Sequence, residues 1–308
     1  QNLPIKSICQ ISQNELCLGT DGKGTKIFNI PKQLITDYPF DNNYLDSGTS
    51  KVHSVLKDNA GNLWIAIYQG VMMIPAQPNS FKYIGYKSIN KNIIGSNCIT
   101  SLCRDHEGIL WIGTDNDGIY GITTELKQKV HYAPHDSPSS VPSTVFGLYE
   151  DSEHNLWFGS YTNGLGRLDK KTGQCSYLQN LTDKNGNRIQ RVYDLVEDQD
   201  KRLWIATMGA GLFYYDLKTG QSVYDPKFNA ATKKYKWISC LLYAGDNHLY
   251  VGTYDGIRCI DLSTDDFKTE EILSRHIIHS LYEDPQGNIW IGSSDGLAEW
   301  NPQTRQLK

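Results

Sequence analysis

Residues 105–122 read Asp-His-Glu-Gly-Ile-Leu-Trp-Ile-Gly-Thr-Asp-Asn-Asp-Gly-Ile-Tyr-Gly-Ile, and variants of this stretch recur along the chain. An internal repeat takes priority over any local pattern, because each copy is one structural unit. Neighbouring copies lie roughly 40 to 47 residues apart, which is a blade-like or helical-repeat spacing. The Trp position is occupied in turn by Cys17, Trp64, Trp111, Trp157, Trp204, Tyr250 and Trp290. The chain therefore contains seven units.

Residues 52–74 show the internal pattern of one unit. Alternating apolar runs at 52–56, 63–68 and 71–74 are separated by turns at 58–61 and 69–70. β-branched and aromatic residues at period two, bounded by Gly, Asn and Asp, predict antiparallel strands joined by hairpins. A fourth strand is expected at 81–86. Four strands per unit of this length predict an all-β, seven-bladed propeller with four-stranded antiparallel blades.

Helical repeats of similar length are the competing architecture. They need apolar residues at three-to-four spacing over a window of at least about 10 residues. No such window occurs, and Gly and Asn turn signals come too often. We therefore expect the chain, residues 1–308, to form a single propeller domain, because repeat folds escape the usual size limit of one core.

Two copies of the unit resemble the two-component regulator propeller repeat. They are Asp-x-x-Gly-Asn-Leu-Trp-Ile at 58–65 and Asp-Pro-Gln-Gly-Asn-Ile-Trp-Ile-Gly-Ser at 284–293, the latter followed by Asp-Gly-Leu at 295–297. The resemblance extends from Ile5 to Asn301. The chain departs from it with Cys17 and Tyr250 at the Trp position and with Asp200-Lys201-Arg202 in one turn.

That resemblance implies the periplasmic sensor region of a Bacteroidetes hybrid two-component sensor, the extracytoplasmic part of an inner-membrane protein. It further implies neighbouring domains, a histidine kinase elsewhere in the protein, and a homodimer. Only seven residues follow Asn301, so the outer strand of the last blade is expected to be barely begun. We expect the chain to be excised from a larger sensor region.

Composition and charge exclude several classes of function. The formal net charge is −4, and Lys and Arg are dispersed without a basic run, which disfavours nucleic-acid binding. No run of 18 apolar residues is present, so no membrane span is expected. The chain has seven Cys without metal-type spacing, and we expect free, buried thiols. No cofactor and no metal are expected, since residues 183–187 only begin a calcium-loop pattern.

Candidate binding residues follow from the hairpin geometry. Because hairpin-linked strands run antiparallel, the loops after Gly-Thr and the starts of the first strands converge on one channel mouth. Turn chemistry accounts for Asp and Asn before Gly there, but it demands no bulky side chain. The candidate ligand-binding residues are Tyr68, Tyr161, Arg191, Trp237, Tyr254 and His276. The repeated Trp residues are expected to be blade core.

Three functions remain open on the sequence. The first is a sensor module for a glycan-derived oligosaccharide. The second is a propeller lyase acting on a polysaccharide or lactone, for which His53 and His276 would be acid and base. The third is a protein-interaction scaffold. No catalytic motif is present, so we expect no enzyme activity in this chain.

Overall fold

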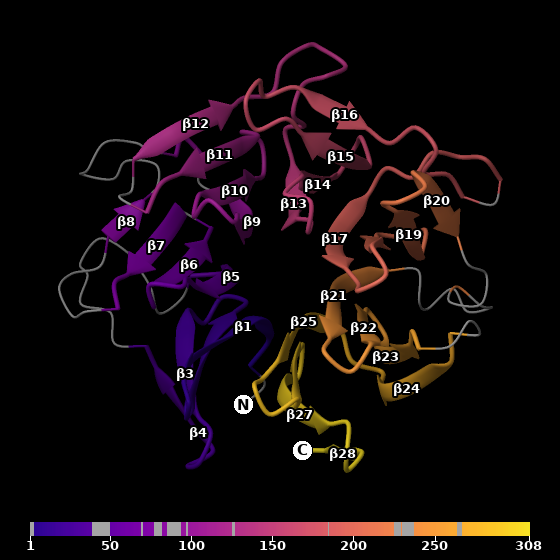
Figure 1. The fold of residues 1–308 in the computed structure, drawn as a ribbon. Helices are drawn as coiled ribbons and strands as arrows, with labels where there is room; N and C mark the ends of the chain where they lie inside the picture. The colour runs from indigo at the N-terminus through magenta and orange to yellow at the C-terminus, as the bar shows by residue number, and fades with distance from the viewer. Residues whose placement is uncertain are drawn as a thin grey trace.

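The computed structural model describes residues 3–38, 50–68, 70–76, 82–84, 94–96, 98–124, 127–183, 185–224, 229, 237–263 and 267–308. Seven four-stranded antiparallel sheets form a ring around a central axis (Figure 1). The predicted seven-bladed propeller is confirmed. The described residues contain no helix.

Each blade is one contiguous stretch of chain, with its strands in sequence order from the axis outward. Blade one is β1 (Ile5–Ser12), β2 (Glu15–Thr20), β3 (Thr25–Asn29) and β4 (Leu34–Asp37). Blade two is β5 (Val52–Lys57), β6 (Leu63–Ile67), β7 (Gly70–Ile74) and β8 (Lys82–Ile84). Blade three is β9 (Ile99–Arg104), β10 (Leu110–Thr114), β11 (Ile119–Ile122) and β12 (Gln128–Tyr132). Blade four is β13 (Val145–Glu150), β14 (Leu156–Ser160), β15 (Leu165–Leu168) and β16 (Cys175–Tyr177).

The last three blades repeat this order. Blade five is β17 (Val192–Glu197), β18 (Arg202–Thr207), β19 (Leu212–Asp216) and β20 (Gln221–Tyr224). Blade six is β21 (Ile238–Ala244), β22 (His248–Thr253), β23 (Gly256–Asp261) and β24 (Thr269–Ser274). Blade seven is β25 (Ile278–Glu283), β26 (Ile289–Ser293), β27 (Gly296–Asn301) and β28 (Gln306–Leu307). The fourth strand of blade seven is thus present but short, and the ends of the fourth strand expected at 81–86 lie outside the described residues.

The hydrophobic core lies between blades. Each repeated Trp is at most 4% exposed, as Trp111 and Trp157 illustrate, so their expected burial is confirmed. Trp111 packs against Leu156 and Phe158 of the next blade. Trp290 of blade seven packs against Ile5 and Leu18 of blade one. Blades seven and one are therefore joined by the same kind of side-chain cluster that joins the other neighbouring blades, and this closes the ring.

The Gly of the Leu-Trp-Ile-Gly-Thr strand marks the closest approach of two blades. A Cβ added at Gly113 would lie 2.9 Å from Val145 Cγ1, and one at Gly159 would lie 2.7 Å from Val192 Cγ1. Real Cβ atoms do not approach so closely, so a larger residue would push the blades apart. The Gly of the repeat motif is therefore needed for the close contact between neighbouring blades.

A buried carboxylate holds the first hairpin of five blades. In blade four, Asp151 Oδ2 accepts a hydrogen bond from Trp157 Nε1 at 2.6 Å, and its Oδ1 accepts the Asn155 N–H at 2.8 Å. The indole therefore fills the core while its N–H secures the turn. The same Asp-to-Trp bond occurs at Asp58, Asp105, Asp198 and Asp284. In blades one and six, Cys17 and Tyr250 leave no indole to donate.

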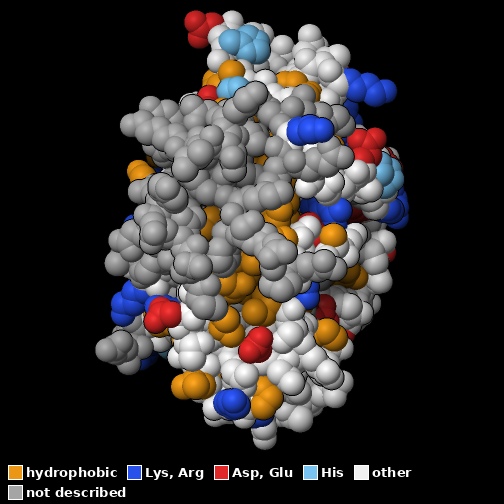
Figure 2. Space-filling view, turned by 90° about the vertical axis from the view of Figure 1, so that its left-hand side faces the viewer, with side chains coloured by type: hydrophobic (Ala, Val, Ile, Leu, Met, Phe, Trp, Pro, Cys, Tyr) orange, Lys and Arg blue, Asp and Glu red, His pale blue; other side chains and the backbone are white. Residues whose placement is uncertain are grey.

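All seven thiols are free in the structure, as expected. Five are buried, whereas Cys98 and Cys103 are half-buried. Figure 2 views the ring from one side, where the Lys and Arg side chains in view are scattered among hydrophobic and acidic ones.

Candidate ligand-binding site

The innermost strands carry a feature that the sequence pattern did not reveal. In every blade, the pairing between the first and second strand shifts by one residue near the start of the first strand. A β-bulge of this kind leaves an extra residue without a cross-strand partner and redirects its side chain. The bulged residues are Lys6, His53, Thr100, Phe146, Tyr193, Ser239 and His279.

These bulges build the wall of the central channel. A cavity of about 520 Å³ lies on the axis and is lined from all seven blades. Every bulged residue contributes to this wall, and so does the residue that follows each one. The following residues are Ser7, Ser54, Ser101, Gly147, Asp194, Cys240 and Ser280. Neighbouring positions on one strand would ordinarily face opposite sides, and the bulge allows both to line the cavity.

One arc of the wall carries nitrogen-containing side chains. It is formed by His279, Lys6 and His53, from blades seven, one and two. Lys6 Nζ lies 3.5 Å from Asp21 Oδ2, and Lys51 Nζ lies 3.3 Å from Asp21 Oδ1. Burial, reinforced by the nearby Lys6, lowers the pKa of His53 to about 4. The same causes lower the pKa of His279, so both imidazoles are neutral at pH 7.

Asp194 joins blades five and six at the channel wall. Its Oδ1 accepts the Leu195 N–H at 2.9 Å, and its Oδ2 accepts the Leu241 N–H at 2.8 Å. Burial raises the pKa of this carboxyl to about 6, and the two backbone bonds only partly oppose that rise. Asp194 therefore remains mainly ionised at pH 7, with both oxygens engaged by the backbone.

Three polar atoms at the wall have no hydrogen-bond partner among the described residues. They are His53 Nε2, Ser101 Oγ and Ser280 Oγ. All three residues line the cavity. Because buried polar groups in native proteins normally find a partner, these atoms mark positions that water or a ligand would satisfy.

The opposite arc is aromatic. Phe146 stacks on Tyr193 with ring centroids 4.9 Å apart. Tyr161 contacts the edge of Phe146 at 5.9 Å, and the Arg191 guanidinium lies 5.0 Å from the Tyr161 centroid. At blade six, Trp237 and Tyr254 form a tilted pair with ring centroids 5.7 Å apart. The rim thus offers exposed aromatic faces beside a polar interior.

The structure places the candidate residues as follows. Tyr68 and Tyr254 line the cavity and are 55% and 43% exposed. Tyr161, Arg191 and Trp237 do not line it but contact residues that do, or one another. His276 lies apart from the cavity lining, with Nε2 3.3 Å from Asp295 Oδ2. Sequence reasoning missed Phe146 and His279 because a regular strand would not aim them at the axis.

A second cluster lies on the opposite face. His106, Glu150 and His154 bring their ligand-type atoms within 4.8 Å of one another. No metal was expected from the sequence. His106 and His154 are far apart in the chain and match no contiguous motif. These three residues could hold a cation, whereas the channel presents no comparable group among the described residues.

Comparison with known families identifies the repeat. Residues 93–116, 139–162, 183–209 and 272–295 match the two component regulator propeller. A search of curated proteins gave no match. Within the described residues, no helix is long and apolar enough to cross a bilayer.

Solved structures share the fold. The extracellular domain of a proposed one-component system from B. thetaiotaomicron is 18% identical, with a TM-score of 0.57. The match covers 100% of this chain and 49% of that domain, so the chain spans about half its length. A streptogramin B lyase is 14% identical with a TM-score of 0.72, covering 97% and 93% of the two chains. An inactive virginiamycin B lyase from Staphylococcus aureus, solved with quinupristin, is 15% identical with a TM-score of 0.72, covering 97% and 95%. The chain is therefore a seven-bladed propeller that contains two-component regulator propeller repeats.

Proposed function

We propose that this chain is the ligand-sensing propeller of an extracytoplasmic two-component sensor and that it binds a glycan-derived oligosaccharide at the channel mouth. One observation supports the proposal above all: neutral polar atoms without hydrogen-bond partners and aromatic side chains surround the same cavity. Sugars present hydroxyl groups and an apolar ring face, which match these two kinds of surface. The repeats match a family named for two-component regulators, which supports the sensor role.

The size and charge of the cavity fit such a ligand. Its volume of about 520 Å³ falls within the range of small-molecule pockets. The two channel imidazoles are neutral at pH 7, Lys6 and Lys51 are paired with Asp21, and Asp194 bonds to the backbone. The interior therefore suits a neutral polyhydroxyl ligand better than a strongly charged one.

Signalling requires more than binding. A ligand shifts an equilibrium only if it favours one arrangement of the domain against its neighbours. In the proposed sensor, the propeller lies in the periplasm, its neighbouring domains carry the change across the membrane, and a histidine kinase and a homodimer complete the pathway. In this proposal the channel binds the ligand, and the other domains transmit the signal.

Titration calorimetry with a panel of neutral and acidic oligosaccharides tests the proposal. We expect saturable binding that weakens at least tenfold in Tyr254→Ala and Trp237→Ala. Arg305→Ala, in the turn between β27 and β28 of blade seven, is the surface control and should bind as the parent chain does. Unaltered affinity in both aromatic variants would move the site away from this mouth.

A lyase is the second candidate, because two fold neighbours are lyases and the channel holds two imidazoles. Fold similarity at this identity does not transmit an activity. We expect mass spectrometry of the same panel to show no cleavage products. His276, which the sequence suggested as the partner of His53, does not line this cavity, so the test uses the two channel imidazoles. Cleavage that is lost in His53→Ala or His279→Ala would establish the lyase instead.

A further inference from the structure

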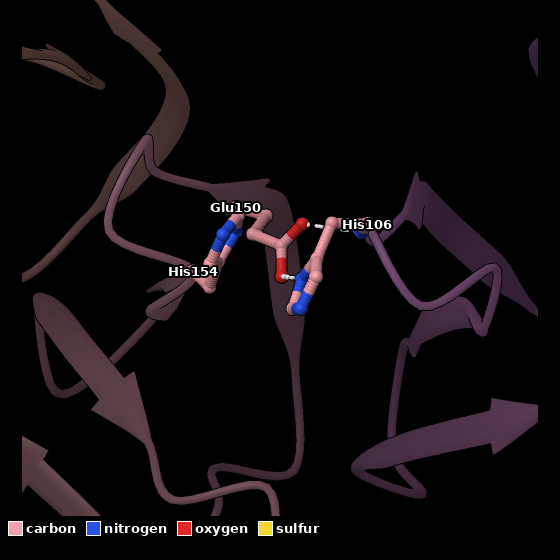
Figure 3. A group of neighbouring side chains, drawn as sticks. All are labelled: His106, Glu150 and His154. Atoms are coloured by element: carbon pink, nitrogen blue, oxygen red, sulfur yellow. Dashed lines mark hydrogen bonds and ion pairs between the residues drawn. The ribbon is translucent and has the colours of Figure 1, made fainter.

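Two imidazoles meet at the junction of blades three and four (Figure 3). They lie in turns that follow the first strand of each blade, and therefore at the opposite end of the blades from the ligand mouth. His106 lies in the turn between β9 and β10, and His154 lies in the turn between β13 and β14. Their rings stack with centroids 3.6 Å apart and planes inclined by 24°. The side chain of Glu150, at the end of β13, reaches the same point.

Glu150 has a structural role that other blades repeat without histidine. Its Oε2 accepts the His106 backbone N–H at 2.6 Å, which joins blade four to blade three. Glu197 accepts the Ser152 N–H in the same way, and Glu283 accepts the Gly245 N–H. Since Ser and Gly serve this contact equally well, the contact itself does not require the His106 imidazole.

The turn that contains His154 likewise does not require a histidine at that position. It adopts a φ of 66°, in the left-handed region that favours Gly or Asn. The corresponding turn positions hold Gly61, Gly108, Lys201, Asn247 and Gly287, all with positive φ. A β-carbon carries a conformational cost there, so the repeat gives no reason for an imidazole at this place.

The chemistry of the cluster selects a class of ligand. His106 Nδ1 lies 2.8 Å from Glu150 Oε1, so an imidazole nitrogen and a carboxylate oxygen already face each other where a shared ion would bind. Lys170 forms ion pairs with Glu150 and with Asp105 Oδ2, the latter at 3.1 Å. One ammonium between two carboxylates leaves a net negative charge beside the imidazoles, which favours a cation.

Space for such a ligand is available. His106 and His154 line an open cavity of about 1080 Å³, so solvent reaches the ring edges. Nitrogen and carboxylate ligands bind Zn²⁺ at about 2.0 to 2.2 Å, so two ligand atoms on one ion are at most about 4.4 Å apart. The three groups lie within 4.8 Å of one another, and rotations of the two exposed His side chains would close the difference.

We propose that His106, Glu150 and His154 bind one divalent transition-metal ion of the Zn²⁺, Ni²⁺ or Cu²⁺ class, with water at the remaining position. Imidazole ligands favour these ions over Mg²⁺ and Ca²⁺, which prefer oxygen. The ion links a turn of blade three to a turn of blade four and so fixes their junction from the side remote from the oligosaccharide site. This metal site is independent of the proposed sensing function.

Zinc titration of the tag-free chain, with Mg²⁺ as the comparison ion, tests the site. We expect one Zn²⁺ per chain, and at least tenfold weaker binding in His106→Ser and in His154→Asn. Both replacements are residues that occupy the equivalent turn position in another blade, Ser152 and Asn247, so the fold should survive. His248→Asn, at the start of β22 in blade six and outside the His106–Glu150–His154 cluster, is the control and should retain full affinity.

A second pair of variants separates coordination from the blade contact. Glu150→Gln and Glu197→Gln each weaken one interblade brace, but only Glu150→Gln should lower zinc affinity. Zinc should also raise the melting temperature of the parent chain and of Glu197→Gln, and leave His106→Ser unchanged. Absence of zinc binding at millimolar zinc, or equal affinity in the parent, His106→Ser and His154→Asn, would overturn the proposal.

Discussion

Replacing Trp157 with Ala tests the packing between blades four and five. The indole is 4% exposed and packs among Leu165, Leu195 and Phe213. Truncating a buried Trp to Ala costs about 3 to 5 kcal/mol through lost burial and the resulting cavity. The change also removes the Nε1 donor to Asp151, which adds about 1 kcal/mol. We therefore expect a loss near the upper end of that range.

Equilibrium denaturation in urea, followed by circular dichroism and by fluorescence, measures the effect. Trp157→Phe is the matched variant, because it keeps most of the ring but removes the indole donor, and Asn155 Nδ2 still reaches Asp151 Oδ2 at 2.9 Å. We expect Trp157→Phe to lose less than half as much stability as Trp157→Ala. A loss below about 1 kcal/mol for Trp157→Ala would show that the slot does not behave as a core site.

Three further predictions concern the channel, its pH dependence and the thiols. Arg191→Ala combined with Trp237→Ala should weaken the dose-response of the intact sensor to its oligosaccharide while leaving the circular dichroism spectrum unchanged; an unaltered response would place recognition elsewhere. The pKa of His53 is about 4 in the folded chain, below its unfolded value, so His53 lowers the stability of the fold as the pH falls from about 6.5 to about 4. The pKa of Asp194 is raised to about 6 in the folded chain, so Asp194 has the opposite effect over the lower part of that range. His53→Gln should therefore make urea midpoints higher at pH 4.5 relative to pH 7 than in the parent chain, and an identical pH profile would contradict this. Burial raises the pKa of Cys9 to about 11 and of Cys175 to about 12, so the five buried thiols should react slowly with a disulfide reagent at pH 8. All seven thiols should react after unfolding in urea, and fast reaction of more than two thiols in the native chain would refute the burial.

The repeat made the architecture predictable from sequence. The recurring Trp predicted the blade number and the core position, and the Gly-containing turns predicted the hairpins. The Asp58-to-Trp64 bond lay within the same motif, yet the sequence alone did not indicate that this Asp is a buried acceptor. Its role depends on how a turn folds back over the indole.

The site was predictable only in outline. Tyr68 and Tyr254 line the axial cavity, as the hairpin pattern predicted, because strand direction follows from that pattern. Phe146 was missed because alternation in a regular strand does not include a bulge. The pairing of His106 with His154 was missed for another reason: it depends on the contact between successive blades, which no spacing within one repeat records.

Because of the seven bulges, each first strand has a residue that lines the cavity without forming a cross-strand pair. A bulged residue such as His279 has no cross-strand partner, so exchanging its side chain leaves the ladder of its blade intact. The frame and the lining of this ring can accordingly change independently of each other. Transplanting the lining of one such propeller into the frame of another should transfer its binding preference, which makes the innermost strands a natural starting point for building biosensors with new specificities.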